Sequence, residues 1–533
     1  MKINCCLHKH DFVNEVQVMV QVFFPGAKFA FVSSLPQIQE ASRPGGDDLI
    51  HILSFWEIPP EGVLAETLKE SSTAIVYKNG AEISRHTFCQ SVAEQNKHEF
   101  LNPRRVVMLA LYHALQKAVG AQTPWGALTG IRPSKLVREW LANGTDDEQI
   151  IARLKEPFCC SEEKAKLALT VARAEERLTR RIFGAFAKKQ EQKQDVIGIY
   201  VSVPFCPSRC IYCSFNMVNS PADANILEQY VTALICECRK KAASLRDSLV
   251  SSVYIGGGTP TVLPEYLLEK LLDTVSGLFC NGEMFPEFTV EAGRPDTLTA
   301  EKLKIMRKYG VNRIAVNPQT LNDRTLAAIG RDHTAADFFR AFDYAREAGF
   351  SCINTDLIAG LPGETLGDMR RNMEALARLL PENITIHTLA VKRASRLIAA
   401  PIKPFRNAGV AIPPFRGVNN EQRGESSFFQ NIAPPISKVV ESMLHEAAES
   451  CASMGFLPYY LYRQKNMVGL FENVGYSLPG SECLYNIGMM AEVQTILGIG
   501  AGAVSKYVRG NKITREFNVK NPEIYISRAL REC

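Results

Sequence analysis

Short apolar runs rich in β-branched residues alternate with longer amphipathic segments through the middle of the chain. The short runs are typical of buried strands, and the longer segments repeat apolar residues every three or four positions, as helices do. The predicted strands are 196–203, 252–255, 288–291, 313–316, 351–358 and 383–391. The predicted helices are 225–245, 264–279, 299–309, 335–348 and 364–380. This alternation indicates right-handed βαβ crossovers and a parallel sheet that forms a barrel or part of one.

The region before this alternation follows a different pattern. Residues 16–24 and 28–32 are predicted strands, and 104–119 is a strongly apolar predicted helix. A long helix is predicted at 161–183, where Glu162 lies near the positive end of the helix dipole. The mixture of strands and helices predicts an α+β domain at the N-terminus.

Changes in composition divide the chain into four predicted parts. A polar, charged stretch at 188–195 is typical of a linker, and a Pro-rich stretch near residue 400 shows no periodicity. The fold class that we predict is α/β, with a partial parallel (β/α)6 barrel. The predicted parts are an N-terminal α+β domain of unknown role at 1–190, the partial barrel at 191–395, an irregular insertion at 396–437 and a C-terminal extension at 438–533.

Composition and charge narrow the class of protein. The chain has 533 residues, of which 46% are hydrophobic and 22% charged, and this excludes a fibrous or wholly disordered protein. Its net charge of +5 is too small for this length to indicate nucleic acid or an anionic membrane. No apolar run reaches the roughly 18 residues that a bilayer span needs, and no apolar export segment begins the chain. We predict a cytoplasmic protein without a membrane span or a nucleic-acid partner.

The 15 cysteines are numerous for an intracellular protein, in which thiols stay reduced. Twelve of them have no partners at metal-binding spacing, and we interpret these as small buried hydrophobic residues. They are Cys5, Cys6, Cys89, Cys159, Cys160, Cys236, Cys238, Cys280, Cys352, Cys451, Cys483 and Cys533.

The other three cysteines share one short segment. Cys206, Cys210 and Cys213 follow the first predicted strand at the spacing C-x3-C-x2-C. Structural zinc is usually held by four ligands, and no second cysteine or histidine pair supplies a fourth. Three thiolates favour a [4Fe–4S] cluster in which one iron is open to another ligand. Zinc remains the alternative.

Further polar and glycine positions follow the other predicted strands. Residues 256–258 are three glycines after the second strand, which allow a ligand to approach the backbone closely or simply form a turn. Glu291 and Gln319 end the third strand and follow the fourth, and surface or capping positions are the alternative for both. Asp356 lies inside an apolar run, where an unpaired carboxylate is costly, and this favours a site.

The ordered motifs YVSVPFCPSRCIYC, YIGGGTPT, VEAGRPDTLT, NPQTLND, GRDH and DLIAGLPGET resemble those of the radical S-adenosylmethionine (SAM) superfamily. Within it they resemble the oxygen-independent coproporphyrinogen III oxidase family, which includes the HemN, HemW and HemZ groups. The resemblance covers roughly 195–395. The segment TPWGALTGIRPSKL and the C-terminal motifs are most similar to HemZ-type coproporphyrinogen dehydrogenases. The resemblance implies the partial barrel of that superfamily and a C-terminal region that covers the substrate.

The resemblance also implies cofactors and the residues that bind them. Cys206, Cys210 and Cys213 match the ligands of a [4Fe–4S] cluster, which works with one or two SAM molecules. No catalytic side chain is implied beyond these cofactors, and a low-potential electron donor is an implied partner. The residues that match SAM contacts are Tyr200, Tyr212, Gly257, Gly258, Thr259, Glu291, Gln319, Arg331, Asp356, Ala390 and Val504.

The implied activity is anaerobic oxidative decarboxylation of coproporphyrinogen III to protoporphyrinogen IX in haem biosynthesis. Two departures keep alternatives open. Ser214 and Phe215 follow Cys213 where the oxidase branch has a further cysteine, and Tyr485 precedes Asn486 where HemW-type chains have histidine. A non-catalytic haem-binding or haem-trafficking protein, and another radical reaction on a tetrapyrrole, are therefore alternatives.

A tetrapyrrole with carboxylate side chains needs basic and aromatic contacts. The candidates are Lys392, Arg393, Arg463, Lys465, Tyr459, Tyr460 and Tyr462. Solvated charge and an aromatic core stripe are the alternatives for these residues. The Gly- and Pro-rich segment at 123–136 is predicted to dock one domain on the next, with anion binding as the alternative.

Overall fold

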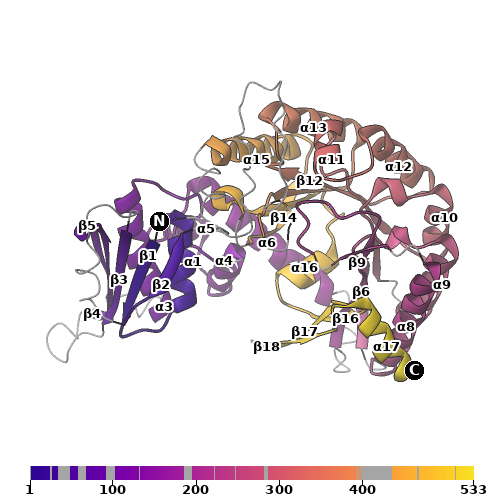
Figure 1. The fold of residues 1–533 in the computed structure, drawn as a ribbon, viewed down its shortest axis with the longest axis horizontal. Helices are drawn as coiled ribbons and strands as arrows, with labels where there is room; N and C mark the ends of the chain where they lie inside the picture. Colours follow the sequence, from indigo (N-terminus) through magenta and orange to yellow (C-terminus); the bar gives the residue numbers. More distant parts are fainter. Residues whose placement is uncertain are drawn as a thin grey trace, which may run out of the picture. The chain divides into compact units, whose positions relative to one another are not determined.

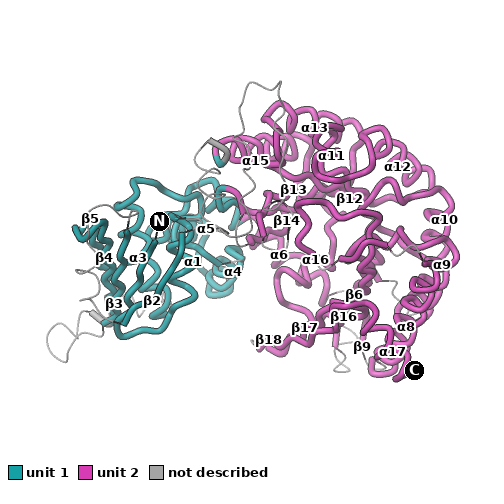
Figure 2. The backbone as a smooth tube through the Cα atoms, in the orientation of Figure 1, with its two compact units in different colours: residues 1–169, 415–437, 469–471 teal, residues 170–414, 438–468, 472–533 magenta. Residues whose placement is uncertain are grey.

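The computed structural model forms two compact units (Figure 2), one built mainly from residues 1–169 and the other mainly from 170–414, 438–468 and 472–533. Each unit is described by itself. The described residues are 2–24, 27–33, 49–57, 68–91, 102–130, 132–184, 195–215, 217–220, 223–245, 248–280, 286–392, 395, 397, 435–464, 467–510 and 512–533.

The first unit is built on a five-stranded sheet in the order β2-β1-β3-β4-β5. Strand β1 runs parallel to β2 and β3, and the β3–β4 and β4–β5 pairs are antiparallel. The strands are β1 Lys2–His8, β2 Lys28–Phe31, β3 Leu49–Glu57, β4 Leu68–Lys78 and β5 Ala81–Ser91. The helices are α1 Val13–Phe23, α3 Pro103–Val119, α4 Pro133–Ala142, α5 Asp147–Lys155 and the start of α6 Glu162–Gly184. Helix α3 packs on β4 and β5.

The predicted strand at 16–24 is wrong, because the segment lies in helix α1. Valines at every second position suggested a strand, but the same residues also have helical spacing. The helix buries Val16, Met19 and Val20, which lie on one helical face and pack inside this unit. Tertiary packing thus decides between two patterns that are both present in this short apolar segment. The predictions at 28–32, 104–119 and 161–183 are confirmed by β2, α3 and α6.

The second unit confirms the α/β class and the partial (β/α)6 barrel. Six strands are hydrogen-bonded in chain order, each parallel to the next. They are β6 Asp195–Val203, β9 Ser248–Gly257, β10 Glu287–Ala292, β11 Arg313–Val316, β12 Ile353–Ala359 and β13 Asn383–Thr388. The helices between them are α8 Ala224–Ala243, α9 Glu265–Phe279, α10 Ala300–Lys308, α11 Asp323–Ala328, α12 Ala335–Glu347 and α13 Leu366–Leu379. Figure 1 shows these helices along the outer rim of this unit.

The C-terminal residues extend both ends of the same sheet. Strands β15 and β14 continue it in antiparallel fashion beyond β13, and β16 adds a parallel strand beside β6, followed by β17 and β18. These strands are β14 Leu457–Tyr462, β15 Asn473–Ser477, β16 Thr495–Ile499, β17 Val504–Arg509 and β18 Lys512–Phe517. The helices are α15 Pro435–Ser453, α16 Leu484–Met490 and α17 Pro522–Arg531.

The short elements are β7 Phe205–Cys206, β8 Val218–Asn219 and the 3-10 turns η2 Pro260–Val262, η3 Pro295–Thr297 and η5 Val468–Leu470.

One cysteine pair differs from the expectation of reduced thiols. Cys236 and Cys533 form a disulfide, with their Cα atoms 5.6 Å apart. Helices α8 and α17 pack together and bring into contact two cysteines that are 297 positions apart in sequence. The predicted insertion at 396–437 lies almost wholly outside the described residues, and so do Arg393 and Lys465. Among the described helices, none combines the length and apolar character needed to cross a membrane.

Candidate functional site

The cysteine loop lies at the carboxyl end of the parallel strands, where barrels of this type place their chemistry. Cys206 belongs to β7, which pairs with β8, and the Cys213 amide donates to the Cys210 carbonyl at 3.1 Å. Cys206 and Cys210 are buried and Cys213 is half-buried. Burial raises the pKa of Cys206 to about 11, and the neighbouring Cys210 and Cys213 add to this effect.

The donor set of this loop fits an iron–sulfur cluster. A buried thiol with a raised pKa loses its proton only when a cation binds, as iron does. Positive side chains surround the loop: Arg294 acts on Cys206, and Arg209 and Arg331 act on Cys213. Among the described residues, no three His, Cys, Asp or Glu side chains are spaced to hold a single metal ion. A cluster has a different requirement, because each cysteine binds a separate iron.

The glycine triplet supports the cysteine loop directly. Gly257 has a φ of +113°, which favours glycine, and a Cβ on Gly258 would collide with the backbone of Phe205. The Thr259 amide donates to the Phe205 carbonyl at 2.7 Å, and the Thr259 hydroxyl lies 3.3 Å from Cys206 Sγ. The triplet therefore lets the two strand ends approach closely beside the first cysteine.

Glu291 lies inside the barrel on β10 and has no positive partner among the described residues. The Tyr254 hydroxyl donates to its Oε1 at 2.5 Å, and the Gly257 amide donates to its Oε2 at 3.3 Å. Burial raises the pKa of Glu291 to about 7, and the negative charge of Asp356 adds to this effect. Such a carboxyl group is available to a cationic ligand group, which would lower its pKa again.

Three stacked tyrosine rings lie beside Glu291, and one of them is that of Tyr254, which donates to it. The Tyr254 and Tyr485 rings lie 4.4 Å apart at 23°, and the Tyr200 ring lies about 6 Å from both. Tyr200 and Tyr254 come from β6 and β9, whereas Tyr485 comes from α16 in the C-terminal region. The sequence marked Tyr485 only as a departure from HemW-type chains. It predicted neither Tyr254 nor Tyr485 as a site residue, because aromatic residues in apolar segments carry no signal of their own.

Arg331 ties the cysteine loop to the ends of two strands. Its Nη1 donates to the Tyr212 hydroxyl at 3.2 Å, and its Nη2 donates to the carbonyls of Gly293 and Asn317 at 2.6 and 2.7 Å. It is 5% exposed and forms no ion pair among the described residues. Because this buried guanidinium donates only to neutral oxygens, its positive charge is available to bind a carboxylate group of a ligand.

Gln319, which follows β11, lies beside Asp356, which is in the middle of β12. The Gln319 amide donates to the Asp356 carbonyl at 3.0 Å, and Gln319 has a φ of +68°. Its side-chain Oε1 is buried without a hydrogen-bond partner. Burial alone would raise the pKa of Asp356, but His387 at 3.5 Å and Asn354 at 2.8 Å lower it. This pair offers acceptor oxygens inside the barrel mouth.

The two remaining predicted contacts are backbone positions at the same edge. Ala390 follows β13 and forms an isolated bridge with Met467. Val504 begins β17, directly after the turn that follows β16, and this turn is bonded to the end of β6 by the Ser202 hydroxyl and the Ala501 carbonyl at 2.9 Å. Both residues are half-buried, and their contact with SAM stays a prediction.

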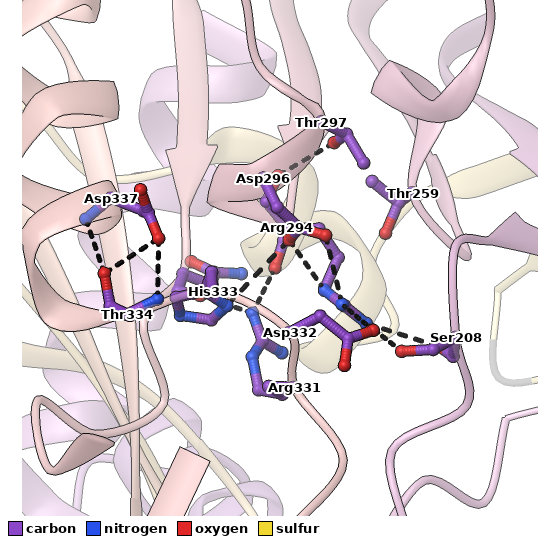
Figure 3. Close-up of polar contacts among 12 residues, drawn as sticks. Ser208, Thr259, Arg294, Asp296, Thr297, Arg331, Asp332, His333, Thr334 and Asp337 are labelled. Carbon is purple, nitrogen blue, oxygen red and sulfur yellow. Dashed lines mark hydrogen bonds and ion pairs between the residues drawn. The ribbon is translucent and has the colours of Figure 1, made fainter. Parts of the chain in front are cut away.

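Three polar residues of this edge were not singled out by the sequence analysis. They are Arg294, Asn317 and His387. Arg294 is 2% exposed and lies beside the cysteine loop (Figure 3). Its position in EAGRPD, directly after a strand, was the available signal. Asn317 and His387 both contact Asp356, and only the fold places them there.

The predicted tetrapyrrole contacts divide into buried and half-buried groups. Tyr459 and Tyr460 on β14 are 2% and 5% exposed and belong to a hydrophobic cluster, as a core stripe would. Arg463 is also buried, and Lys392 is half-buried near Cys213. Among the described candidate cations, Lys392 is thus close enough to the cysteine loop to interact with the charge of Cys213.

Comparison with known proteins agrees with this fold. Residues 200–376 match the family model of the radical SAM superfamily, and the chain is a radical SAM protein. The chain is 36% identical to the oxygen-independent coproporphyrinogen-III oxidase-like protein HemZ of Bacillus subtilis (strain 168), over 83% of this chain and 82% of the relative. It therefore belongs to the HemN, HemW and HemZ group of that superfamily. Its cofactors are a [4Fe–4S] cluster and SAM.

Two further comparisons cover less of the chain. The chain is 39% identical to the heme chaperone HemW of Bacillus subtilis (strain 168), over 36% of this chain and 50% of the relative. Among solved structures, coproporphyrinogen III oxidase (HemN) from Escherichia coli, described as a radical SAM enzyme, matches with a TM-score of 0.48. That match has 21% identity and covers 66% of this chain and 73% of the other.

Proposed function

We propose that this chain is a radical SAM enzyme that decarboxylates coproporphyrinogen III oxidatively, without oxygen, to protoporphyrinogen IX. One arrangement carries the proposal: the cysteine loop and Glu291 lie at the carboxyl ends of parallel strands, Arg331 is hydrogen-bonded to the carbonyls that follow two of these strands, and Asp356 lies within the neighbouring strand β12. The name of the HemZ-type relative, an oxidase-like protein, supports the same reaction class for this chain.

The chain's own residues would hold the cofactors at this edge. Cys206, Cys210 and Cys213 are the proposed cluster ligands. Glu291 would accept from the ammonium group of SAM, because it is a carboxylate inside the barrel that forms no ion pair among the described residues. Asp356 and the free Oε1 of Gln319 would accept from hydroxyl groups. The other proposed SAM contacts, for one or two molecules, are Tyr200, Tyr212, Gly257, Gly258, Thr259, Arg331, Ala390 and Val504.

The reaction balances for each of two propionate side chains. When bound and reduced, the cluster and SAM supply a carbon radical that takes one hydrogen atom from the substrate. The propionate then loses carbon dioxide and passes one electron to an external one-electron acceptor, which leaves a vinyl group. A low-potential electron donor is therefore a proposed partner, and no nucleic-acid partner is proposed. The stacked tyrosines beside Glu291 would close the barrel and exclude water from the radical step.

The test is an anaerobic assay of the full chain. The cluster is reconstituted, SAM, a reductant and coproporphyrinogen III are added, and the tetrapyrrole is followed by mass. We expect loss of two carboxyl groups in the wild type and in Cys352→Ala, and no loss in Cys210→Ala. Cys352 is a matched control, because it is half-buried at the amino end of the same sheet. An unchanged tetrapyrrole despite SAM cleavage would reject the oxidase activity.

A second candidate function is the non-catalytic binding of haem. It is favoured by Phe215, which follows Cys213 closely and is 70% exposed, and by the similarity to a protein named heme chaperone. This function predicts a stoichiometric change in haem absorbance on titration, together with an unchanged coproporphyrinogen in the assay above. Catalytic turnover of coproporphyrinogen would reject it as the main function.

A further inference from the structure

A buried arginine outside the predicted cofactor contacts lies against the cysteine loop. Arg294 follows β10, between Gly293 and Pro295, and its side chain is 2% exposed. Figure 3 shows it between Ser208 on one side and Asp296 and Asp332 on the other. Burial of a charged side chain is costly unless its donors find acceptors, so the direction of each donor is informative.

One nitrogen of the guanidinium is directed at the cysteine loop. Arg294 Nη1 donates to the carbonyl and the hydroxyl of Ser208 at 3.3 and 3.1 Å, and it lies 4.0 Å from Cys210 Sγ. Ser208 is in the loop between the first two cysteines, and its hydroxyl also donates to the Gly330 carbonyl at 3.2 Å. Arg294 therefore contacts both the backbone of this loop and the thiol sulfur of a predicted cluster ligand, Cys210.

The other two nitrogens hold the guanidinium in place. Asp296 accepts from Nε at 3.0 Å and from Nη2 at 3.2 Å, and this two-point contact fixes the plane of the group. Asp332, whose side chain is 70% exposed, lies 3.7 Å from Nη2. Because Asp296 engages the far side of the group, Nη1 is left to meet the sulfur and the loop.

We propose that Arg294 is a positioning residue that raises the reduction potential of the cluster, by donating toward the Cys210 sulfur and placing positive charge beside it. The inference rests on the proposed cofactor site and deepens it. Reduction adds a negative charge to the cluster, and a buried cation within hydrogen-bond reach of a ligand sulfur stabilises that state. Lysine cannot reproduce this contact fully, because it lacks the planar fork that Asp296 holds.

A merely structural role for Arg294 makes a different prediction. If the arginine only pinned the loop, loss of Arg294 or of Asp296 would loosen the same contact and move the potential in the same direction or not at all. An electrostatic role gives opposite signs. Arg294→Gln removes a positive charge beside the sulfur, whereas Asp296→Asn removes the negative charge that offsets it.

The experiment is a potentiometric titration of the reconstituted cluster in the full chain, followed by electron paramagnetic resonance, without tetrapyrrole. For Arg294→Gln we expect at least a tenfold shift of the reduction equilibrium toward the oxidised cluster, which is about 59 mV for one electron. We expect Arg294→Lys to lie between this variant and the wild type, and Asp296→Asn to shift the equilibrium toward the reduced cluster. Arg313→Lys, a buried arginine at the amino end of β11, should leave it unchanged.

Each outcome decides the proposal. An unchanged potential in Arg294→Gln, or shifts of the same sign in Arg294→Gln and Asp296→Asn, would overturn it. If Arg294→Gln fails to hold a cluster, the reduction potential of Asp296→Asn decides instead, and an unchanged potential in that variant overturns the proposal. The potential is measured without substrate, so it is independent of the oxidase activity. Failure of the wild type to form a [4Fe–4S] cluster would instead reject the cofactor site itself.

Discussion

Charged side chains have different partners at the two ends of the second unit's parallel sheet. At the amino end, opposite charges on neighbouring strands face each other. Arg313 Nε lies 3.4 Å from Glu287, and Glu287 also accepts from the amides of Leu484 and Tyr485 at 2.9 and 3.1 Å. A second, half-buried pair joins Arg346 on α12 to Glu382, just before β13, at 2.8 Å.

At the carboxyl end, the buried charges of Arg331 and Glu291 meet neutral groups instead, whereas Arg294 is paired with Asp296. Arg331 donates to a hydroxyl and two carbonyls, and Glu291 accepts from a hydroxyl and an amide. Neither of them forms an ion pair among the described residues. The opposite charges at the amino end neutralise one another, whereas the charges of Arg331 and Glu291 at the carboxyl end remain available to ligands. We therefore expect amino-end substitutions to reduce stability and carboxyl-end substitutions to reduce cofactor binding.

The largest effect on stability is expected for Arg313→Met. It leaves Glu287 buried, with a side chain 10% exposed and without its cation, and breaking a buried pair in this way costs about 3–5 kcal/mol. Chemical denaturation of the full chain measures the change in unfolding free energy. The control is Arg370→Met, whose partner Glu446 is reached from an exposed position, and it should cost less than about 1 kcal/mol. Equal costs for the two variants would contradict the comparison.

Glu291→Gln should have the opposite profile. Loss of a charged acceptor is expected to weaken SAM binding about 10- to 100-fold, since hydrogen bonds to charged groups contribute about 1.5–3 kcal/mol. The unfolding free energy at pH 8 should not fall, because a neutral amide replaces a carboxylate whose pKa is raised by burial. Equilibrium binding of SAM to the reconstituted protein measures the first effect, and denaturation measures the second.

Glu364→Gln is the matched control for Glu291→Gln. Glu364 is also buried, burial raises its pKa to about 7, and it is hydrogen-bonded to Thr320 at the same end of the barrel. Its position in the loop after β12 is not among the predicted SAM contacts. A loss of SAM affinity in Glu364→Gln as large as that in Glu291→Gln would mean that the effect is not specific to Glu291.

The raised pKa of Glu291 also predicts a pH dependence. Its folded value, about 7, exceeds its ordinary value of 4.5, so between these values the folded chain holds a proton that the unfolded chain has lost. Stability should therefore fall as pH rises through this window, by up to about 1.4 kcal/mol per pH unit. SAM affinity should rise over the same window as the carboxylate forms. Subtracting the Glu291→Gln profiles from the wild-type profiles isolates this group, and identical profiles would refute the assignment.

Local patterns predict most of the barrel and only part of the site. The strand and helix periods found β6, β9, β10, β11, β12 and β13, because each is a local feature of the chain. The cysteine spacing likewise placed Cys206, Cys210 and Cys213 on one loop. By contrast, β16 pairs with β6 across 298 positions, as Thr495 does with Ile197, and no local pattern encodes such a partner.

The missed residues have the same physical cause. Tyr485 reaches the site from α16, and Arg294 is recognisable only when Asp296 and Ser208 are seen around it. Residue type and spacing identify groups that act in one segment, such as the cysteines. They do not identify groups whose role comes from neighbours brought together by tertiary packing.

The smallest effect tests whether position at the carboxyl end is sufficient for a binding role. Thr334 follows His333 at this end, but it caps α12: its hydroxyl accepts from the Asp337 amide at 3.2 Å, and its own amide donates to Asp337 at 2.9 Å (Figure 3). Thr334→Ala should cost about 1 kcal/mol of stability, as loss of a helix cap does, with SAM affinity unchanged. Thr274→Ala, inside helix α9, is the control without a capping role. A tenfold loss of SAM affinity in Thr334→Ala would mean that location at the carboxyl end decides whether a residue acts in binding. The hydrogen-bond partners of its side chain would then not decide it.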